Sequence, residues 1–296
     1  MPPSNLQKWV TLLPAGLWLT VFFLFPLGIV LIYSFCEKKN AFGGIRYNFT
    51  LQNYVKIFES VEITNPETHQ PEPSYLHLKP LWRSSKIAII NTLLCLIIGY
   101  PVAYFIATRR RNKNFFLMLV MLPFWTSFLI RTYSWMMILR TEGILNSVLI
   151  SLNIINQPLD LLYNEKAILI GLFYNQLPFM ILPLYASIEK MDRTLINAAK
   201  DLGASMFQVT RTILLPLTKP GIISGSILVG VFSFGSYIDA CLLGGSKAPM
   251  LGTVIQEQFY KNRPFGAALS LLIMALVLSL LMFYVHFNSQ TQGSKK

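Results

Sequence analysis

The stretch INAAKDLGASMFQVTRTILLPLTKPGI, from Ile196 to Ile222, is a long polar interval between two apolar runs of the chain. Apolar residues before Gly203 recur every three or four positions, which predicts a helix with one apolar face: Ile188, Met191, Leu195, Ala198, Ala199 and Leu202. Gly203 predicts the end of that helix in a left-handed conformation. A second short helix is expected through Met206, Phe207 and Thr210, before Pro216 and Pro220 lead into the next apolar run. The segment is therefore predicted to form a helix–turn–helix.

The composition places this segment in a membrane protein. Of the 296 residues only 13% are charged, against about 25% in soluble domains, and the mean hydropathy is +0.50. A hydropathy this high with so few charges indicates an integral membrane protein. The formal charge of +12 comes from basic residues that lie between apolar runs. That distribution favours membrane orientation over nucleic-acid binding, and no nucleic-acid partner is expected.

Six apolar runs are long enough to cross a bilayer, which takes about 20 residues. They are Leu12–Phe35, Ile87–Thr108, Phe115–Leu139, Ala167–Ile188, Ile222–Leu243 and Ala267–Phe287. The first run is too long for the apolar part of a signal peptide and lacks a small-residue cleavage site, so we expect it to be retained. The sequence thus predicts an all-α protein with six transmembrane helices.

Basic residues in short loops predict the orientation of these spans. The loop at Arg109–Asn114, the segment at 189–221 and the tail at Lys295–Lys296 all fall on one side, which is predicted to be cytoplasmic together with both termini. Residues 37–85 would form a periplasmic loop, whose length explains its tolerance of lysine and arginine. Within it, TNPETHQPEPS is predicted to be mobile because it is rich in Pro and Glu. The predicted organisation is 1–36 (N-terminus and first span), 37–85 (outer loop), 86–288 (permease core) and 289–296 (cytoplasmic tail).

On spacing alone, the 189–221 segment could also be an amphipathic helix that only lies on lipid. Its residues, however, resemble the EAA loop of binding-protein-dependent ABC importer permeases: Asn197, Ala198, Ala199, Gly203, Ile213, Leu215 and Pro216 have that loop's spacing. The resemblance implies that the segment, including Ala204 and Ser205, is the coupling helix that sits in a cleft of an ATPase subunit. The family usually has Glu where this chain has Asn197, so this position offers neutral rather than charge-assisted hydrogen bonds.

Three further stretches, LPFWTSFLIRTYSW at Leu122–Trp135, LPFMILPLYASIEKMD at Leu177–Asp192 and FTLQNYVKIF at Phe49–Phe58, resemble the first permease subunit of spermidine/putrescine importers. The resemblance implies a type I ABC importer permease in the bacterial inner membrane. The implied partners are a second permease subunit, an ATPase dimer that binds ATP and magnesium, and a periplasmic polyamine-binding protein. Relatives with similar loops carry iron, thiamine or phosphonates, so these cargoes remain alternatives. The outer loop near 62–80 is longer than is typical of the family.

The chain is not expected to be an enzyme or to bind a cofactor or metal of its own. It has no GxxxxGK[ST] stretch for ATP and no cluster of residues suited to catalysis or metal ligation. The cysteines, Cys36, Cys95 and Cys241, are expected to be buried and unpaired. A stand-alone secondary transporter is a further alternative, but it would be expected to have carboxylates for coupling ions near mid-membrane and often an inverted repeat, and neither is found.

Polar residues within apolar runs mark candidate functional positions. Arg131 and Asp239 have similar predicted depths, so they either form an ion pair or each reach the outer interface; Asp239 could meet a cationic substrate. Asn175 and Gln176 should face other helices or a pore. Aromatic residues could contact ammonium groups or simply pack: Trp125, Tyr133, Trp135, Phe232, Phe234 and Tyr237. The GIISG stretch at Gly221–Gly225 permits a close helix contact, at the subunit interface or along the path.

Overall fold

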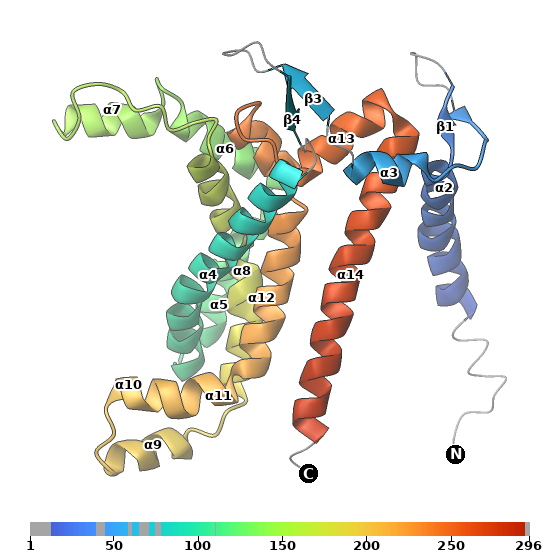
Figure 1. Cartoon of the computed structure of the whole chain (residues 1–296). Coiled ribbons are helices and arrows are strands. Elements are labelled where there is room, and N and C mark those ends of the chain that lie inside the picture. The colour runs from blue at the N-terminus through green and yellow to red at the C-terminus, as the bar shows by residue number, and fades with distance from the viewer. Residues whose placement is uncertain are drawn as a thin grey trace. The chain divides into compact units, whose positions relative to one another are not determined.

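The computed structural model describes residues 13–39, 45–58, 61–64, 71–74, 78–109 and 111–293 (Figure 1). The chain divides into two compact units, Met1–His77 with Val254–Lys296, and Leu78–Thr253. Predictions for residues 1–12 and 294–296, including the tail lysines, lie outside the described residues.

The first unit contains helices near both ends of the chain. A π-helical turn, η1 (Thr20–Leu24), leads into α2 (Phe25–Ser34), and α2 packs beside the long α14 (Arg263–Gly293). The short α3 (Gln52–Phe58) buries Ile57 against Phe265 and Leu269 of α14. Buried Asn53 of α3 donates hydrogen bonds to the carbonyls of Ser34 and Cys36, which ties α3 to the end of α2.

Two small antiparallel ribbons also belong to this unit. Strands β1 (Glu37–Lys38) and β2 (Ile45–Arg46) pair, as do β3 (Val61–Thr64) and β4 (Pro71–Ser74). The second ribbon includes Thr64 and Pro71–Ser74 of the TNPETHQPEPS stretch. Residues 65–70 of that stretch lie outside the described residues, and its mobility stays a prediction. The two prolines of β4 lack an N–H, and a strand of a two-stranded ribbon is an edge that tolerates them.

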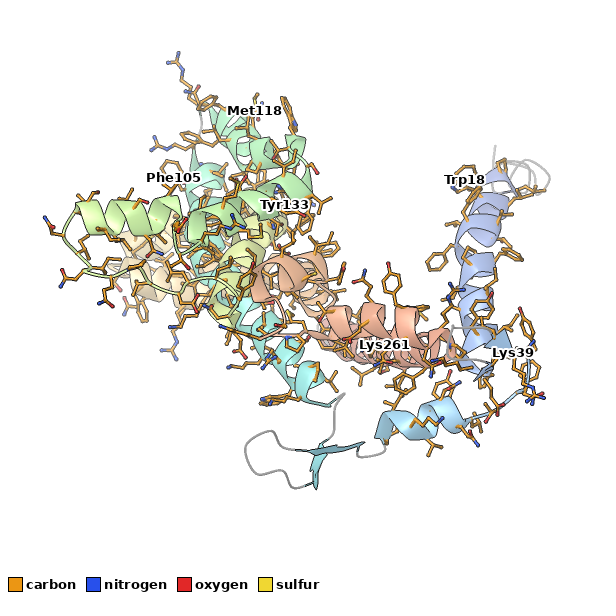
Figure 2. All side chains as sticks on the ribbon, turned by 90° about the horizontal axis from the view of Figure 1, so that it is seen from above. Trp18, Lys39, Phe105, Met118, Tyr133 and Lys261 are labelled. Carbon is orange, nitrogen blue, oxygen red and sulfur yellow. The ribbon has the colours of Figure 1, made fainter. Side chains whose placement is uncertain are left out.

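The second unit is a bundle built on α4 (Leu78–Thr108), α8 (Glu165–Glu189) and α12 (Lys219–Phe234), which pack against one another (Figure 1). One buried cluster lies around Met180, Leu184 and Val229, and another around Ile168, Leu172 and Leu243. Large apolar side chains such as Phe105 and Met118 remain exposed on the outside of this unit (Figure 2). Such outward-facing apolar surface is what lipid-facing helices require.

The remaining elements of this unit connect the bundle helices. They are α5 (Lys113–Met121), η2 (Leu122–Trp125), α6 (Phe128–Leu139), α7 (Ile144–Ser151), α9 (Thr194–Asp201), α10 (Met206–Val209), η3 (Thr210–Leu214), α11 (Leu215–Leu217) and η4 (Ala240–Gly244). Helix α13 (Leu251–Lys261) begins in this unit and continues into the other.

Glycines bring α12 close to α8. A Cβ on Gly221 would lie 2.5 Å from the Cβ of Ser187 and 2.7 Å from the carbonyl oxygen of Pro183. A Cβ on Gly225 would lie 2.7 Å from the sulfur of Met180. The GIISG stretch therefore makes the close contact that its spacing predicts, and the contact is with α8 of the same chain.

Three described helices are long and apolar enough to cross a membrane: Leu13–Ser34, Lys79–Thr108 and Glu165–Glu189. Two bent pairs bring the number to as many as five if each is one span: Lys113–Trp125 with Phe128–Ser151, at 85°, and Met206–Leu217 with Lys219–Phe234, at 71°. The segment Arg263–Ser279 is a shorter apolar helix. The expectation of six spans remains a prediction.

The structure corrects two of the predicted spans. Phe115–Leu139 is not one helix, because the α-helix changes to a 3-10 helix at Leu122–Trp125 and the helical backbone is interrupted before Phe128. Ile222–Leu243 is not continuous either, because α12 ends at Phe234 and is followed by Gly235. A count of apolar residues does not detect such breaks, since the residues on both sides of each break are apolar. Of the cysteines, Cys36 and Cys95 are buried and unpaired as expected, whereas Cys241 is unpaired but exposed.

Candidate functional site

The 189–221 segment forms two short helices joined at Gly203. Helix α9 ends with Gly203 at φ +83°, in the left-handed region. The N–H of Gly203 donates to the carbonyl of Lys200, and the N–H of Ala204 donates to the carbonyl of Ala199. These two bonds make a Schellman motif, which satisfies carbonyls that the helix end would leave free. The predicted left-handed helix end at Gly203 is confirmed.

The second helix starts with a capping box. The hydroxyl of Ser205 accepts a hydrogen bond from the N–H of Gln208, and the amide oxygen of Gln208 accepts one from the N–H of Ser205. Two N–H groups at the helix start are thereby satisfied. The second helix therefore starts at a defined residue, and it continues from α10 through η3 and α11 to Leu217.

The burial pattern of the segment differs from the predicted apolar face. Ile196, Val209 and Leu214 form its small core, whereas Leu195 is 46% exposed and Leu202 is 89% exposed. The prediction of one apolar face running from Ile188 to Leu202 is wrong, because α8 ends at Glu189 and a new helix, α9, begins at Thr194. The EAA-like residues Asn197 and Ala198 are exposed on α9, Ala199 is partly buried, and Leu215 and Pro216 are exposed on α11. Ile213 packs against the small core.

Charged groups fix this segment to the bundle. The guanidinium of Arg193 donates to the carbonyls of Ala107 and Thr108 at the end of α4, and cations at a helix C-terminus are favourable. Lys113 and Glu189 form an ion pair at 2.6 Å. The N–H of Thr194 donates to Asp192, and this bond lowers the pKa of that carboxyl group. The helix–turn–helix is thus held at one end of the bundle by contacts to α4 and α5.

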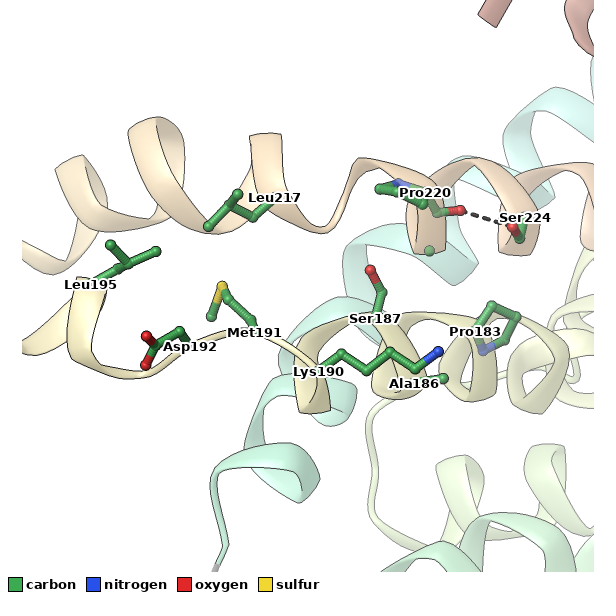
Figure 3. A pocket seen from close by; sticks show the side chains of 11 residues that line it. Pro183, Ala186, Ser187, Lys190, Met191, Asp192, Leu195, Leu217, Pro220 and Ser224 are labelled. Carbon is green, nitrogen blue, oxygen red and sulfur yellow. Dashed lines mark hydrogen bonds between the residues drawn. The ribbon is translucent and has the colours of Figure 1, made fainter. Parts of the chain in front are cut away.

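A cavity of about 610 Å³ lies where the segment joins the bundle (Figure 3). Leu217 faces it from one side, and Met191 and Leu195 face it from the other. Lys190, Asp192 and Ser187 give it a polar edge.

A second cavity, of about 420 Å³, lies where the helices are broken. We call it the polar pocket. It is lined by Phe124 of η2, Phe128 and Arg131 of α6, Asn175, Gln176 and Phe179 of α8, Phe232 of α12, and Ser236, Tyr237, Ile238 and Asp239 before η4. Its volume is within the range of small-molecule sites. Irregular backbone within a membrane is tolerated where it lines a cavity or is buried in protein, and both helix breaks meet here.

Asp239 is the acidic group of the polar pocket, and it is 1% exposed. One carboxylate oxygen accepts hydrogen bonds from the hydroxyl of Thr132 at 3.0 Å and the amide of Asn175 at 3.1 Å. The other oxygen accepts from the hydroxyl of Ser236 at 3.1 Å. All three donors are neutral, so they hold the carboxylate in place without cancelling its charge.

Arg131 is the basic group of the polar pocket, and it is 9% exposed. Its guanidinium carbon lies 5.3 Å from the ring centre of Phe124 and 5.9 Å from that of Phe128. Among the described residues, it forms no ion pair with Asp239. The predicted ion pair between Arg131 and Asp239 is therefore not formed, although both side chains line the same pocket. Aromatic rings contact the guanidinium, and neutral donors hydrogen-bond to the carboxylate.

A buried hydrogen-bond network borders the pocket. The amide of Asn91 donates to the amide oxygen of Gln176 at 3.0 Å and to the hydroxyl of Ser233 at 2.9 Å. The hydroxyl of Ser233 lies 2.5 Å from the same oxygen of Gln176. This network links α4, α8 and α12, as expected of polar groups inside a membrane bundle.

Comparison with known proteins identifies the family. The model of the binding-protein-dependent transport system inner membrane component family matches residues 96–291. The chain belongs to this family of permeases. It is 40% identical to the spermidine/putrescine transport system permease protein PotB of Haemophilus influenzae, over 92% of this chain and 90% of that protein. It is 38% identical to PotB of Escherichia coli, over 90% and 92%.

Solved structures agree on the fold of the permease. A crystal structure of a bacterial ABC transporter involved in the import of alginate matches with a TM-score of 0.69 and 17% identity, over 96% of this chain and 95% of that one. The MetNI methionine ABC transporter in an inward-facing conformation matches with a TM-score of 0.52 and 17% identity, over 71% of this chain and 93% of that one.

The polar pocket of the permease brings together only part of the predicted path. Asn175, Gln176, Tyr237 and Asp239 line it. Trp125 and Tyr133 do not, since they are 77% and 47% exposed, and Tyr133 lies on the outside of α6 (Figure 2). Trp135 packs edge-on against Tyr174 instead, with ring centres 5.7 Å apart.

Sequence reasoning missed several pocket residues. Phe124, Phe128 and Phe179 line the pocket, and Phe179 contacts both Phe124 and Phe232 with ring centres 5.0 Å apart. Thr132 holds Asp239 and was also missed. The four-residue spacing of Phe124 and Phe128 and the polar Thr132 beside Arg131 were available signals. Without knowledge of the break after Trp125, however, neither signal could be assigned to a face.

Proposed function

We propose that this permease carries polyamines, spermidine and putrescine, across the bacterial inner membrane as one subunit of an ATP-driven importer. The observation that carries the proposal is identity of 37–40% with spermidine/putrescine permeases over nine-tenths of the chain. The polar pocket supports it, because a buried carboxylate with neutral partners and a row of aromatic rings is suited to an ammonium group.

The proposed assembly contains this chain, a second permease, two ATPase subunits that bind ATP and magnesium, and a periplasmic polyamine-binding protein. In it, the chain has six spans with both termini in the cytoplasm. The two bent pairs count as one span each, and α14 supplies the sixth. The 189–221 segment is then cytoplasmic, as its basic residues also favour.

The 189–221 segment is the proposed docking site for the ATPase. Its exposed apolar side chains support this role, because Leu202 and Phe207 are 89% and 75% exposed beside a turn that a Schellman motif and a capping box hold in place. Exposed apolar groups on an ordered element mark an interaction surface. The bonds from Arg193 to the end of α4 would pass movement of a docked ATPase to the bundle.

The test is uptake of labelled spermidine and putrescine by cells that lack this chain and then receive it back, with neighbouring subunits intact. Uptake that is lost and then restored supports the proposal. Unchanged uptake in cells with no second polyamine importer would exclude polyamines as the cargo. Co-purification of an ATPase with the chain tests the docking proposal separately.

A further inference from the structure

Arg131 has donor groups that nothing in the described part of the chain satisfies. Its Nε and Nη1 atoms are buried without a hydrogen-bond partner, and the side chain faces the polar pocket. A buried charge without a partner is unfavourable, and proteins usually pair or hydrogen-bond such groups. Asp239 lines the same pocket but is held by Thr132, Asn175 and Ser236 instead.

The aromatic rings explain how the cation is held. Arg131 lies over Phe124 and Phe128, at distances at which the negative face of a ring attracts a cation. These rings also form part of the surface that an incoming ammonium group would use. Phe124 in turn contacts Phe179, and Phe179 contacts Phe232. The guanidinium therefore sits at one end of a row of aromatic faces.

Resting on the proposed polyamine cargo, we propose that Arg131 is a resident cation that competes with the substrate ammonium for the polar pocket and so limits how tightly the substrate is held. The pocket contains one carboxylate and one guanidinium when empty, so its charges balance. A polyamine adds positive charge near Arg131 and supplies no acceptor for Nε or Nη1. Binding is therefore opposed by the guanidinium, and release is favoured.

A transport site benefits from this arrangement. Its cargo must bind well enough to enter but weakly enough to leave. Without Arg131, Asp239 and the aromatic rings would form an unopposed cation site. Arg131 thus limits how tightly the substrate is held, while Asp239 and the rings provide the attraction.

The test is spermidine uptake as a function of concentration in cells carrying the wild-type chain, Arg131→Gln, Arg131→Lys or Arg140→Gln. Arg140 ends the same helix but is exposed, so Arg140→Gln controls for the loss of an arginine. Immunoblots of membranes normalise each rate to the amount of chain. We expect Arg131→Gln to lower KM by about tenfold and also to lower the maximal rate. Arg131→Lys should keep both close to wild type, since it preserves the cation.

Three results would overturn the inference. An increase in KM for Arg131→Gln would mean that the arginine attracts the substrate. Equal losses of rate for the Gln and Lys variants, with unchanged KM, would assign Arg131 a purely structural role. An unchanged KM and rate for Arg131→Gln would mean that the resident cation has no effect. If the wild-type chain supports no polyamine uptake, the proposed function fails and this inference with it, so the two failures are distinguishable.

Discussion

Substitution of Gly203 separates the backbone conformation of the docking segment from its side-chain contacts. Gly203 has φ +83°, and a Cβ at this position would meet none of the described atoms within 4 Å. An L-residue in this conformation costs roughly 1–2 kcal/mol, and Asn tolerates it better than other residues. A change of one or two kcal/mol alters a population ratio by roughly 5–30-fold. The fraction of chains with the correct turn should fall by up to that factor.

We therefore expect polyamine uptake to be highest in the wild-type chain and to decrease from Gly203→Asn to Gly203→Ala to Gly203→Val. The amount of chain in the membrane should not change, because the turn lies outside the bundle core and no side chain is displaced. Initial uptake rates and membrane immunoblots measure the two quantities. Gly28→Ala is the matched control, since its Cβ also meets no atom of the described residues within 4 Å but its φ is not positive. Equal uptake by Gly203→Asn and Gly203→Val would refute the reasoning.

Two further substitutions test the bundle. Gly221→Ala should destabilise the permease by about 1–3 kcal/mol, because the new Cβ would lie 2.5 Å from the Cβ of Ser187 and 2.7 Å from the oxygen of Pro183. Thermal unfolding of the detergent-solubilised chain measures this loss. Asn91→Leu should lower stability by about 0.5–1.5 kcal/mol, because it removes one of two donors to the buried amide oxygen of Gln176, which keeps its contact with the Ser233 hydroxyl. The same unfolding assay applies.

Controls for both substitutions lie on the same helices. Gly230→Ala on α12 would bring a Cβ to 3.5 Å from the hydroxyl of Thr92, an ordinary contact, so little change is expected. Thr92→Val on α4 removes a hydroxyl whose one hydrogen bond within the described part of the chain is to the carbonyl of Ala88, one turn earlier in its own helix, and should matter less than Asn91→Leu. If Gly221→Ala and Gly230→Ala had equal effects, the close contact between α12 and α8 would have no energetic importance.

Local chemistry made the turn of the docking segment predictable from sequence. A left-handed helix end at Gly203 depends on residues within a few positions, and the structure places a glycine with φ +83° there. The buried face of α9 was predicted one residue out of phase, with Leu195 in place of Ile196. Helical periodicity was carried across residues 190–193, where the chain leaves one helix and starts another.

The polar pocket was only partly predictable, for a different physical reason. Polar residues inside apolar runs identified Arg131, Asn175 and Asp239, because such residues are unfavourable in lipid unless they have partners. The aromatic lining was assigned to Trp125 rather than Phe124. Which of two neighbouring aromatic residues faces inward depends on where a helix breaks, and tertiary packing around the pocket determines that position.

The most direct test of whether the polar pocket binds the polyamine is the concentration dependence of spermidine uptake. It is measured for Asp239→Asn and for wild type, at equal amounts of chain in the membrane. The substitution keeps the size of the side chain and removes the charge that Thr132, Asn175 and Ser236 leave unneutralised. We predict that KM rises about tenfold or more, which corresponds to at least about 1.4 kcal/mol of lost attraction for an ammonium group. An unchanged KM would contradict the claim that this pocket binds the polyamine.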